Sequence, residues 1–191
     1  ARLARAGLLS TMRRPDEALA EYAEVLRRAP GQRDALTGRA MLHLSLGRAV
    51  EAMADAETLV KIEPDVAEGL LLRGWIHREL GRPGDAYVDF RRAQDLAHDM
   101  WPRYHNAGVS ALTARRYDDA RRMFILATAL APEQPDPYVV LARMHVEQGK
   151  YAEAVDDYAQ ALERRENPAH RYHRANSLLA LRRTAEALKD Y

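Results

Sequence analysis

Histidine is the residue type in this chain best suited to binding a metal, and seven histidines occur in 191 residues. Three of them, His43, His77 and His145, recur at multiples of 34 residues. A zinc site needs three or four ligands within about 2.1 Å of the metal, whereas equivalent points on successive packed helices lie about 10 Å apart. We interpret these histidines as packing residues, and we predict neither a metal site nor a cofactor.

Arginine pairs could bind nucleic acid if they shared one face that carried few acids. Acids lie one helical turn before them instead, as Glu24 does before Arg28 and Asp118 before Arg122. Pairs at this spacing support solvated helix surfaces. The net charge is only +1. We therefore predict no nucleic-acid partner.

Patterns typical of catalysis are missing from the sequence. The chain has no cysteine, and it contains no glycine-rich phosphate loop, no His-Glu-x-x-His pair and no nucleophile elbow. The carboxylates belong to surface helical pairs, so no acid and base are positioned together. We predict that the chain is not an enzyme.

Two amphipathic helices joined by a tight turn are predicted over residues 101–134. Small and apolar residues follow a helical period in each half. The first run is Tyr104, Ala107, Gly108, Ala111, Leu112 and Ala114, and the second is Ala120, Phe124, Ala127 and Leu130. Pro132 ends the second helix, because proline lacks an amide hydrogen and clashes with the preceding turn.

The same pattern recurs every 34 residues when Trp101 is counted as position 1 of a unit. Position 8 is always small, position 20 is always alanine, position 24 is bulky except at Ala56, and position 32 is proline except at His98. The columns are Ala6, Ala40, Gly74, Gly108 and Ala142; Ala18, Ala52, Ala86, Ala120 and Ala154; Tyr22, Ala56, Phe90, Phe124 and Tyr158; and Pro30, Pro64, His98 and Pro132. After Asn167 the register slips by one residue and continues at Ala175, Ala187 and Tyr191.

These columns resemble the tetratricopeptide repeat, a helix–turn–helix unit of about 34 residues. The resemblance implies an all-α fold, a right-handed superhelical solenoid of about five and a half repeats. We expect one solenoid over 1–191, with units 1–32, 33–66, 67–100, 101–134, 135–167 and 168–191 and incomplete units at both ends. We also expect the chain to be a fragment of a longer protein.

Two backbone and side-chain features of the repeats carry separate expectations. Gly47 ends the first helix of its unit, where a positive φ is needed. Position 7 is usually apolar in the family, but here it holds Arg5, Arg39, Arg73 and Arg174, with Ala107 and Leu141 in the other units. We expect the arginine stems to cover apolar surface while the guanidinium groups reach water.

In the resembling family, the first helices of the repeats line a concave groove through positions 2, 5, 6, 9, 12 and 13. The predicted peptide-binding groove here comprises Met41, Leu44, Leu71, Leu72, Trp75, Arg78, His105, Asn106, Val109, Leu112, Val139, Val140, Arg143, Tyr172 and Asn176. These residues include an apolar stripe that we expect to be exposed and to bind a partner. We expect Trp75 to be its central residue and to lie outside the core.

Acids flank the predicted groove at Asp34, Glu68, Glu79, Asp136 and Glu147. An apolar floor with acidic rims suits an amphipathic helix or an extended peptide with basic flanks. The groove lacks the lysine and asparagine with which some family members grip an acidic chaperone tail, because Thr37 and Met41 occupy those positions in the second unit.

The sequence therefore predicts a non-enzymatic adaptor that binds a protein segment in its groove. Two alternatives stay open: a regulatory or substrate-recruiting domain of a larger enzyme or transcription regulator, and a module that self-associates end to end. No apolar run approaches the ~18 residues that a membrane span requires, so we predict no membrane partner and a cytoplasmic location. The preference for arginine over lysine favours a bacterial source.

Overall fold

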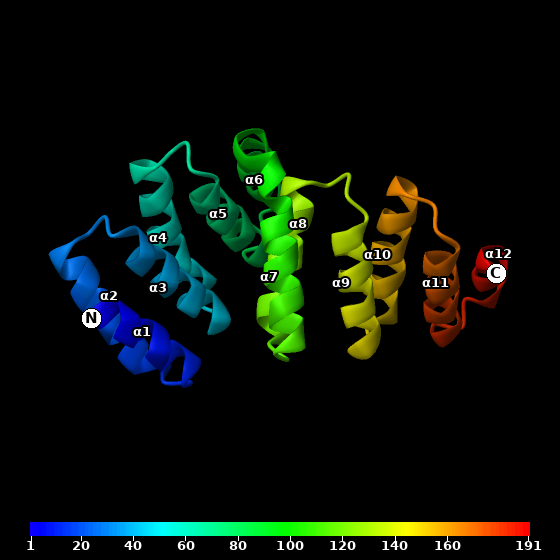
Figure 1. Ribbon diagram of the computed structural model, residues 1–191, viewed down its shortest axis with the longest axis horizontal. Coiled ribbons are helices and arrows are strands. Elements are labelled where there is room, and N and C mark those ends of the chain that lie inside the picture. The colour runs from blue at the N-terminus through cyan, green and yellow to red at the C-terminus, as the bar shows by residue number, and fades with distance from the viewer. The chain divides into compact units, whose positions relative to one another are not determined.

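The computed structural model describes residues 1–191 as twelve α-helices and one short 3₁₀ helix, with no strand (Figure 1). The helices are α1 (Arg2–Thr11), α2 (Pro15–Arg28), α3 (Arg33–Ser45), α4 (Ala49–Ile62), α5 (Ala67–Glu79), α6 (Pro83–Ala97), η1 (His98–Met100), α7 (Trp101–Thr113), α8 (Tyr117–Leu130), α9 (Asp136–Glu147), α10 (Tyr151–Arg164), α11 (Pro168–Ala180) and α12 (Thr184–Asp190). The predicted all-α fold of helix–turn–helix repeats is confirmed. No helix is both long and apolar enough to cross a membrane.

The helices form two compact units, Ala1–Ala97 and His98–Tyr191. The first unit contains α1 to α6, and the second contains η1 and α7 to α12. Within each unit a helix contacts its neighbours along the chain, and the closest association is between the two helices of one repeat. The boundary between the units falls at His98, the one position in its column that is not proline.

The turn inside each repeat places position 15 in the left-handed region of backbone space. Gly47, Gly81 and Gly149 have φ values of 71°, 70° and 71°. The prediction for Gly47 is confirmed. The other three repeats place arginine at this position, with φ between 56° and 60° at Arg13, Arg115 and Arg182. A side chain at positive φ is unfavourable, so these three turns are held by the helices on either side.

Small residues at position 8 let the ring at position 24 lie against the backbone of the first helix. A Cβ atom added to Gly108 would lie 2.8 Å from the Phe124 ring, and one added to Gly74 would lie 2.7 Å from the Phe90 ring. These distances are shorter than van der Waals contact. The two helices of a repeat therefore approach as closely as the predicted pattern of small residues requires.

The arginines at position 7 do not direct their guanidinium groups to water as expected. Each forms a two-pronged ion pair with an aspartate of the second helix in its own repeat. The Nε and Nη2 atoms of Arg39 donate to Asp55 over 2.8 and 2.6 Å, and Arg73 binds Asp89 over the same distances. Arg174 and Asp190 form the same pair. Because Asp55 and Asp89 are only 3% exposed, they need a cation, and the arginine supplies it.

Candidate binding surface

The second unit presents one face of α7, α9 and α11, and it contains most of the residues predicted for the groove. On α7, Asn106 and Val109 are exposed and Leu112 is half-buried. On α11, Tyr172 and Asn176 are exposed. Val109 and Tyr172 retain 42% and 54% of their surface, which is high for apolar side chains of this size. This exposed apolar area is available for contact with a partner.

Helix α9 contributes the centre of this face. Val139 and Val140 are half-buried, and Arg143 is exposed on the next turn. Arg143 forms no ion pair, whereas the rim residue Asp136 is bound by Arg165 Nη2 over 2.8 Å. A cation without a carboxylate partner is therefore offered to solvent in the middle of an otherwise weakly charged face.

An aromatic group forms the α11 end of this face. The rings of Tyr172 and Tyr191 meet edge to face, with centroids 5.8 Å apart. Tyr191 donates its hydroxyl hydrogen to Asn176 Oδ1 over 2.7 Å. These contacts hold Tyr172 in place while it remains exposed, so a partner would meet a ring that is already positioned.

Position 6 of a repeat packs against the ring at position 24 of the repeat before it. Val140 packs against the cluster that contains Phe124, and His173 stacks on Tyr158 with ring centroids 6.0 Å apart. A Cβ atom on Gly38 would lie 2.5 Å from the Tyr22 hydroxyl. Position 6 is therefore shared between the groove and the interior.

This packing explains why Leu72 is not exposed as predicted. Leu72 is at position 6, and the preceding repeat has Ala56 where the others have a ring or Tyr22. Leu72 and Ile76 lie in the same core cluster as Ala56. Leu72 therefore contributes apolar volume to the interior beside an alanine.

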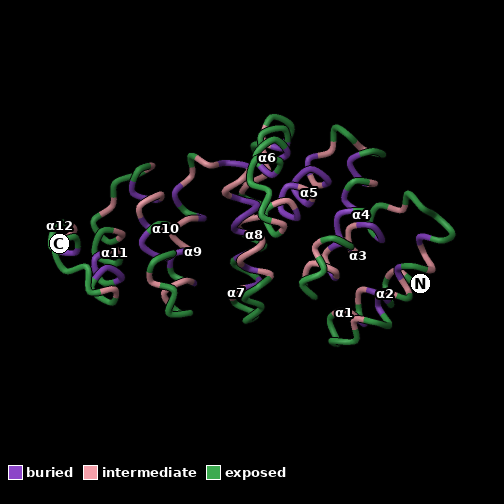
Figure 2. The backbone as a smooth tube through the Cα atoms, turned by 180° about the vertical axis from the view of Figure 1, so that it is seen from behind, coloured by how far each residue is buried: buried purple, intermediate pink, exposed green.

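The expectation of an exposed apolar row is also wrong for Leu71 and Trp75. Helix α5 is buried over most of its length (Figure 2), and these two side chains are only 1% and 3% exposed. Trp75 donates from its indole nitrogen to Glu79 Oε1 over 2.8 Å, which satisfies its polar atom. Trp75 is a core residue by burial. In the same unit Met41 and Leu44 are half-buried against the core, and Arg78 is exposed.

The histidines pack inside the repeats rather than converge on one point. Among the described residues, no group of three or more His, Cys, Asp or Glu could hold a metal ion. The Nδ1 atoms of His43, His105 and His170 are buried and have no hydrogen-bond partner. Burial lowers the pKa of each of these imidazoles, because it disfavours the charged form. His105 is half-buried and meets the Phe124 ring edge to face at 5.4 Å.

The chain is similar to several solved structures. It shares 20% identity with a crystal structure of PilW, described as a type IV pilus biogenesis factor, with a TM-score of 0.55 and coverage of 99% of this chain and 88% of that one. For the Thermus thermophilus protein TTC0263 the values are 24%, 0.53, 93% and 97%. For YrrB, described as having an unusual peptide-binding site, they are 18%, 0.51, 95% and 90%. At these identities the likeness concerns the fold.

No curated protein matches the chain. The family model described as tetratricopeptide repeat matches residues 3–65, 105–164 and 139–191. These ranges cover most of the sequence and both compact units. The chain belongs to the tetratricopeptide repeat family.

Proposed function

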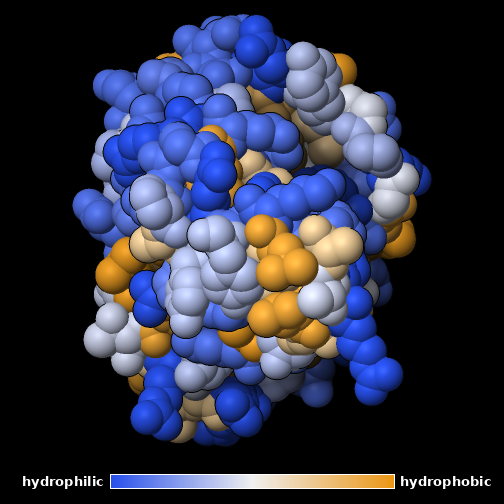
Figure 3. All heavy atoms as spheres, turned by 90° about the vertical axis from the view of Figure 1, so that its right-hand side faces the viewer, coloured by the Kyte–Doolittle hydropathy of each residue, from blue (hydrophilic) through white to orange (hydrophobic).

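We propose that this chain is a non-enzymatic adaptor that binds a protein segment on the face formed by α7, α9 and α11. The observation that carries the proposal is the exposure of Val109, Tyr172 and Leu179 on successive first helices of one unit. Figure 3 views the molecule from the side of α12 and shows groups of apolar side chains among hydrophilic ones. Apolar exposure of this kind is typical of interaction sites.

The proposed partner is an amphipathic segment. Its apolar side would cover Val109 and Tyr172, and a basic flank would approach Glu147, which is exposed and forms no ion pair. The other acidic rim of this unit contributes less, because Asp136 already has Arg165 as its partner. Support for a peptide ligand also comes from YrrB, a structural relative that has a peptide-binding site.

The test compares two exposed tyrosines of the same unit. Tyr172→Ala alters the proposed surface, and Tyr117→Ala alters an exposed tyrosine at the start of α8, which is 46% exposed in the parent chain. Proteins captured from a lysate of the source organism are quantified by mass spectrometry for both variants and the parent. The proposal expects loss of captured partner with Tyr172→Ala only. Equal capture by Tyr172→Ala and the parent would contradict it.

Self-association is the alternative that the same face allows, because Leu188 on α12 is 71% exposed. Light scattering over a dilution series measures it directly. A mass that stays at that of one chain favours the adaptor. A mass that rises with concentration and falls again in Leu188→Asp favours association between copies.

A further inference from the structure

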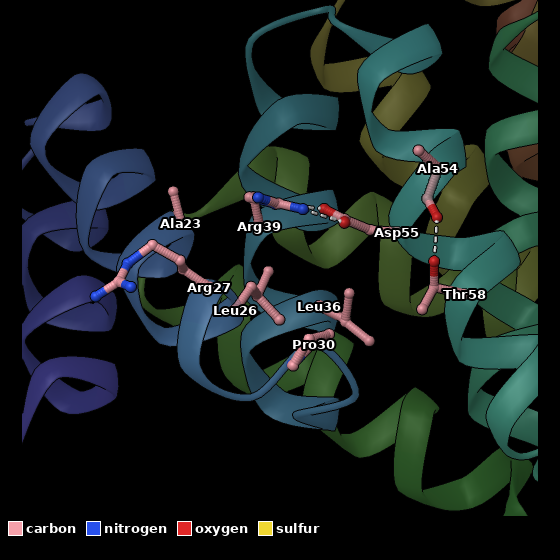
Figure 4. Close-up of a pocket in the computed structure, with 9 residues that line it drawn as sticks. All are labelled: Ala23, Leu26, Arg27, Pro30, Leu36, Arg39, Ala54, Asp55 and Thr58. Carbon is pink, nitrogen blue, oxygen red and sulfur yellow. Dashed lines mark hydrogen bonds and ion pairs between the residues drawn. The ribbon is translucent and has the colours of Figure 1, made fainter.

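A cavity of about 420 Å³ lies in the first unit, between α2 on one side and α3 and α4 on the other (Figure 4). It is separate from the face proposed above, since every lining residue belongs to α2, α3, α4 or the turn after α2. Leu26 and Leu36, both buried, form an apolar floor. The volume falls within the range of about 300–1,000 Å³ that is usual for small-molecule sites.

The cavity is open because its walls are small. Ala23, Ala54 and Thr58 line it. The groove between the next pair of second helices repeats the same floor and the same ion pair, but 34 residues later the wall positions hold Glu57, Val88 and Arg92. Arg92 also extends to Asp65, with 3.1 Å between Nη2 and Oδ1. Two equivalent grooves in one chain therefore differ mainly in the size of three side chains.

One cation faces the cavity. Arg39 uses Nε and Nη2 to bind Asp55, and its Nη1 atom has no hydrogen-bond partner. The Arg39 side chain is 29% exposed and that of Asp55 is 4% exposed. The carboxylate thus lies behind the guanidinium and fixes it, while the free edge of the guanidinium remains accessible. Arg27 contributes only its stem, because its guanidinium points away from the cavity in Figure 4 and binds Glu24.

We propose that this cavity binds a small carboxylic acid with an apolar body, such as a phenyl ring or a branched alkyl group. The apolar body would contact Leu26 and Leu36, and the carboxylate would accept hydrogen bonds from Arg39 Nη1. A charge-assisted hydrogen bond to a guanidinium that is already oriented needs little further ordering, which favours binding. A neutral amide of the same shape lacks the charge and binds less well.

The probe is phenylacetate, titrated into the isotope-labelled full chain and followed by the backbone amide signals of Leu26, Leu36 and Thr58. The proposal expects saturable shifts at these residues. Phenylacetamide is the matched neutral compound, and its affinity is expected to be at least about tenfold lower, as the loss of a hydrogen bond between charged groups predicts. Absence of saturable shifts, or equal affinity for acid and amide, would overturn the proposal.

The control variant transfers the walls of the second groove to the first as Ala23→Glu, Ala54→Val and Thr58→Arg. These substitutions leave the Arg39–Asp55 pair and the apolar floor unchanged, and the melting temperature checks that the variant is folded. The folded variant is expected to lose the shifts caused by phenylacetate. Unchanged binding by the filled variant would show that the acid binds elsewhere.

The same chemistry can come from a free acid or from the last residue of a peptide. The tripeptide acetyl-Ala-Ala-Phe, compared with phenylacetate in the parent chain, separates these sources. Tighter binding of the tripeptide assigns the cavity to a peptide carboxyl terminus, and tighter binding of phenylacetate assigns it to a free acid. Both results keep the cavity as the site, provided that the filled variant binds neither compound.

Discussion

At the scale of single residues, the volumes of side chains in separate helices of each unit compensate one another. A ring at position 24 is met by glycine where the next helix comes closest, as with Tyr22 and Gly38. Where position 24 is the small Ala56, the next repeat supplies Leu72. Interiors of proteins are close-packed, so a change of volume at one of these positions must be absorbed at the other.

Gly108→Leu is expected to destabilise the protein. A side chain there would overlap the Phe124 ring, since even a Cβ atom would lie 2.8 Å from it, and overpacking costs about 1–3 kcal/mol. Leucine gains just under ~1 kcal/mol in helix propensity, which is the smaller effect. Urea unfolding measures the difference. Gly7→Ala is the control, because nothing lies within 4 Å of the added Cβ, and its midpoint should stay level or rise. A raised midpoint for Gly108→Leu would contradict this packing.

Trp75→Ala is expected to lower the free energy of unfolding by about 3–5 kcal/mol, as for other buried aromatic residues. The side chain is 3% exposed, so its removal leaves a cavity. Tyr87→Ala serves as the exposed control, since Tyr87 is 66% exposed, and it should change stability by no more than about 0.5 kcal/mol. Equal effects of the two substitutions would show that Trp75 does not pack in the core.

Acid should destabilise the protein through its half-buried histidines. The pKa of His105 is lowered by burial in the folded chain, so the unfolded chain binds the proton first as the pH falls. Stability is therefore complete above the ordinary histidine pKa of about 6.5 and declines as the pH falls from there towards the folded pKa. His105→Gln should reduce this decline, measured by urea unfolding at several pH values. Asn106→Gln, which carries no titrating group, should leave the pH dependence unchanged, and a similar change in both variants would argue against His105.

At the scale of the helix pair, the ion pair between positions 7 and 23 links the two helices of a repeat. Three repeats use arginine and aspartate, as in Arg73 with Asp89. The fourth replaces both with apolar residues, Ala107 and Met123. In the fifth, position 7 is Leu141, and Asp157 is instead contacted by His145 Nδ1 at 2.8 Å. The chain thus never leaves the buried aspartate without a partner.

This pattern predicts a strongly non-additive pair of substitutions. Arg73→Ala alone leaves Asp89 buried and uncompensated, which costs about 3–5 kcal/mol. Arg73→Ala combined with Asp89→Met reproduces the fourth repeat and should recover most of the loss. Urea unfolding of both single variants and the double variant gives the coupling energy. A double variant as unstable as Arg73→Ala would mean that the apolar pair of the fourth repeat depends on its own surroundings.

At the scale of the whole molecule, contacts run mainly between helices that are close in sequence. Such linear arrays lose structure locally, because each repeat is stabilised by its neighbours alone. We expect Gly108→Leu to increase hydrogen exchange in α7 and α8 while α1 and α2 keep the protection they have in the parent chain. Exchange measured by mass spectrometry of peptides from each helix tests this. An equal increase in every helix would show that the chain opens as one cooperative unit.

The sequence by itself determined the helices, their turns and the close approach of the two helices in each repeat. These features depend on local preferences and on a period that repeats along the chain, so position 8 at Gly108 and the left-handed turn at Gly47 could be read directly. The resemblance to the family also directed attention to the first helices, and on α7 and α11 the exposed Val109 and Tyr172 lie where they were expected.

Only the tertiary structure decided which side chains of the first helices are buried and which are available. Trp75 and Leu71 share a helix face with exposed residues of other repeats, and their burial depends on neighbours that no local pattern specifies. The ion pair of Arg39 and the small walls of the cavity, such as Ala23, likewise depend on pairs of residues in different helices. Signals for both were present, since an aspartate follows Arg39, Arg73 and Arg174 at a constant interval and Glu57 replaces Ala23 one repeat later. Their meaning required the distances between helices, because side-chain contacts across a repeat are set by packing rather than by the order of residues along the chain.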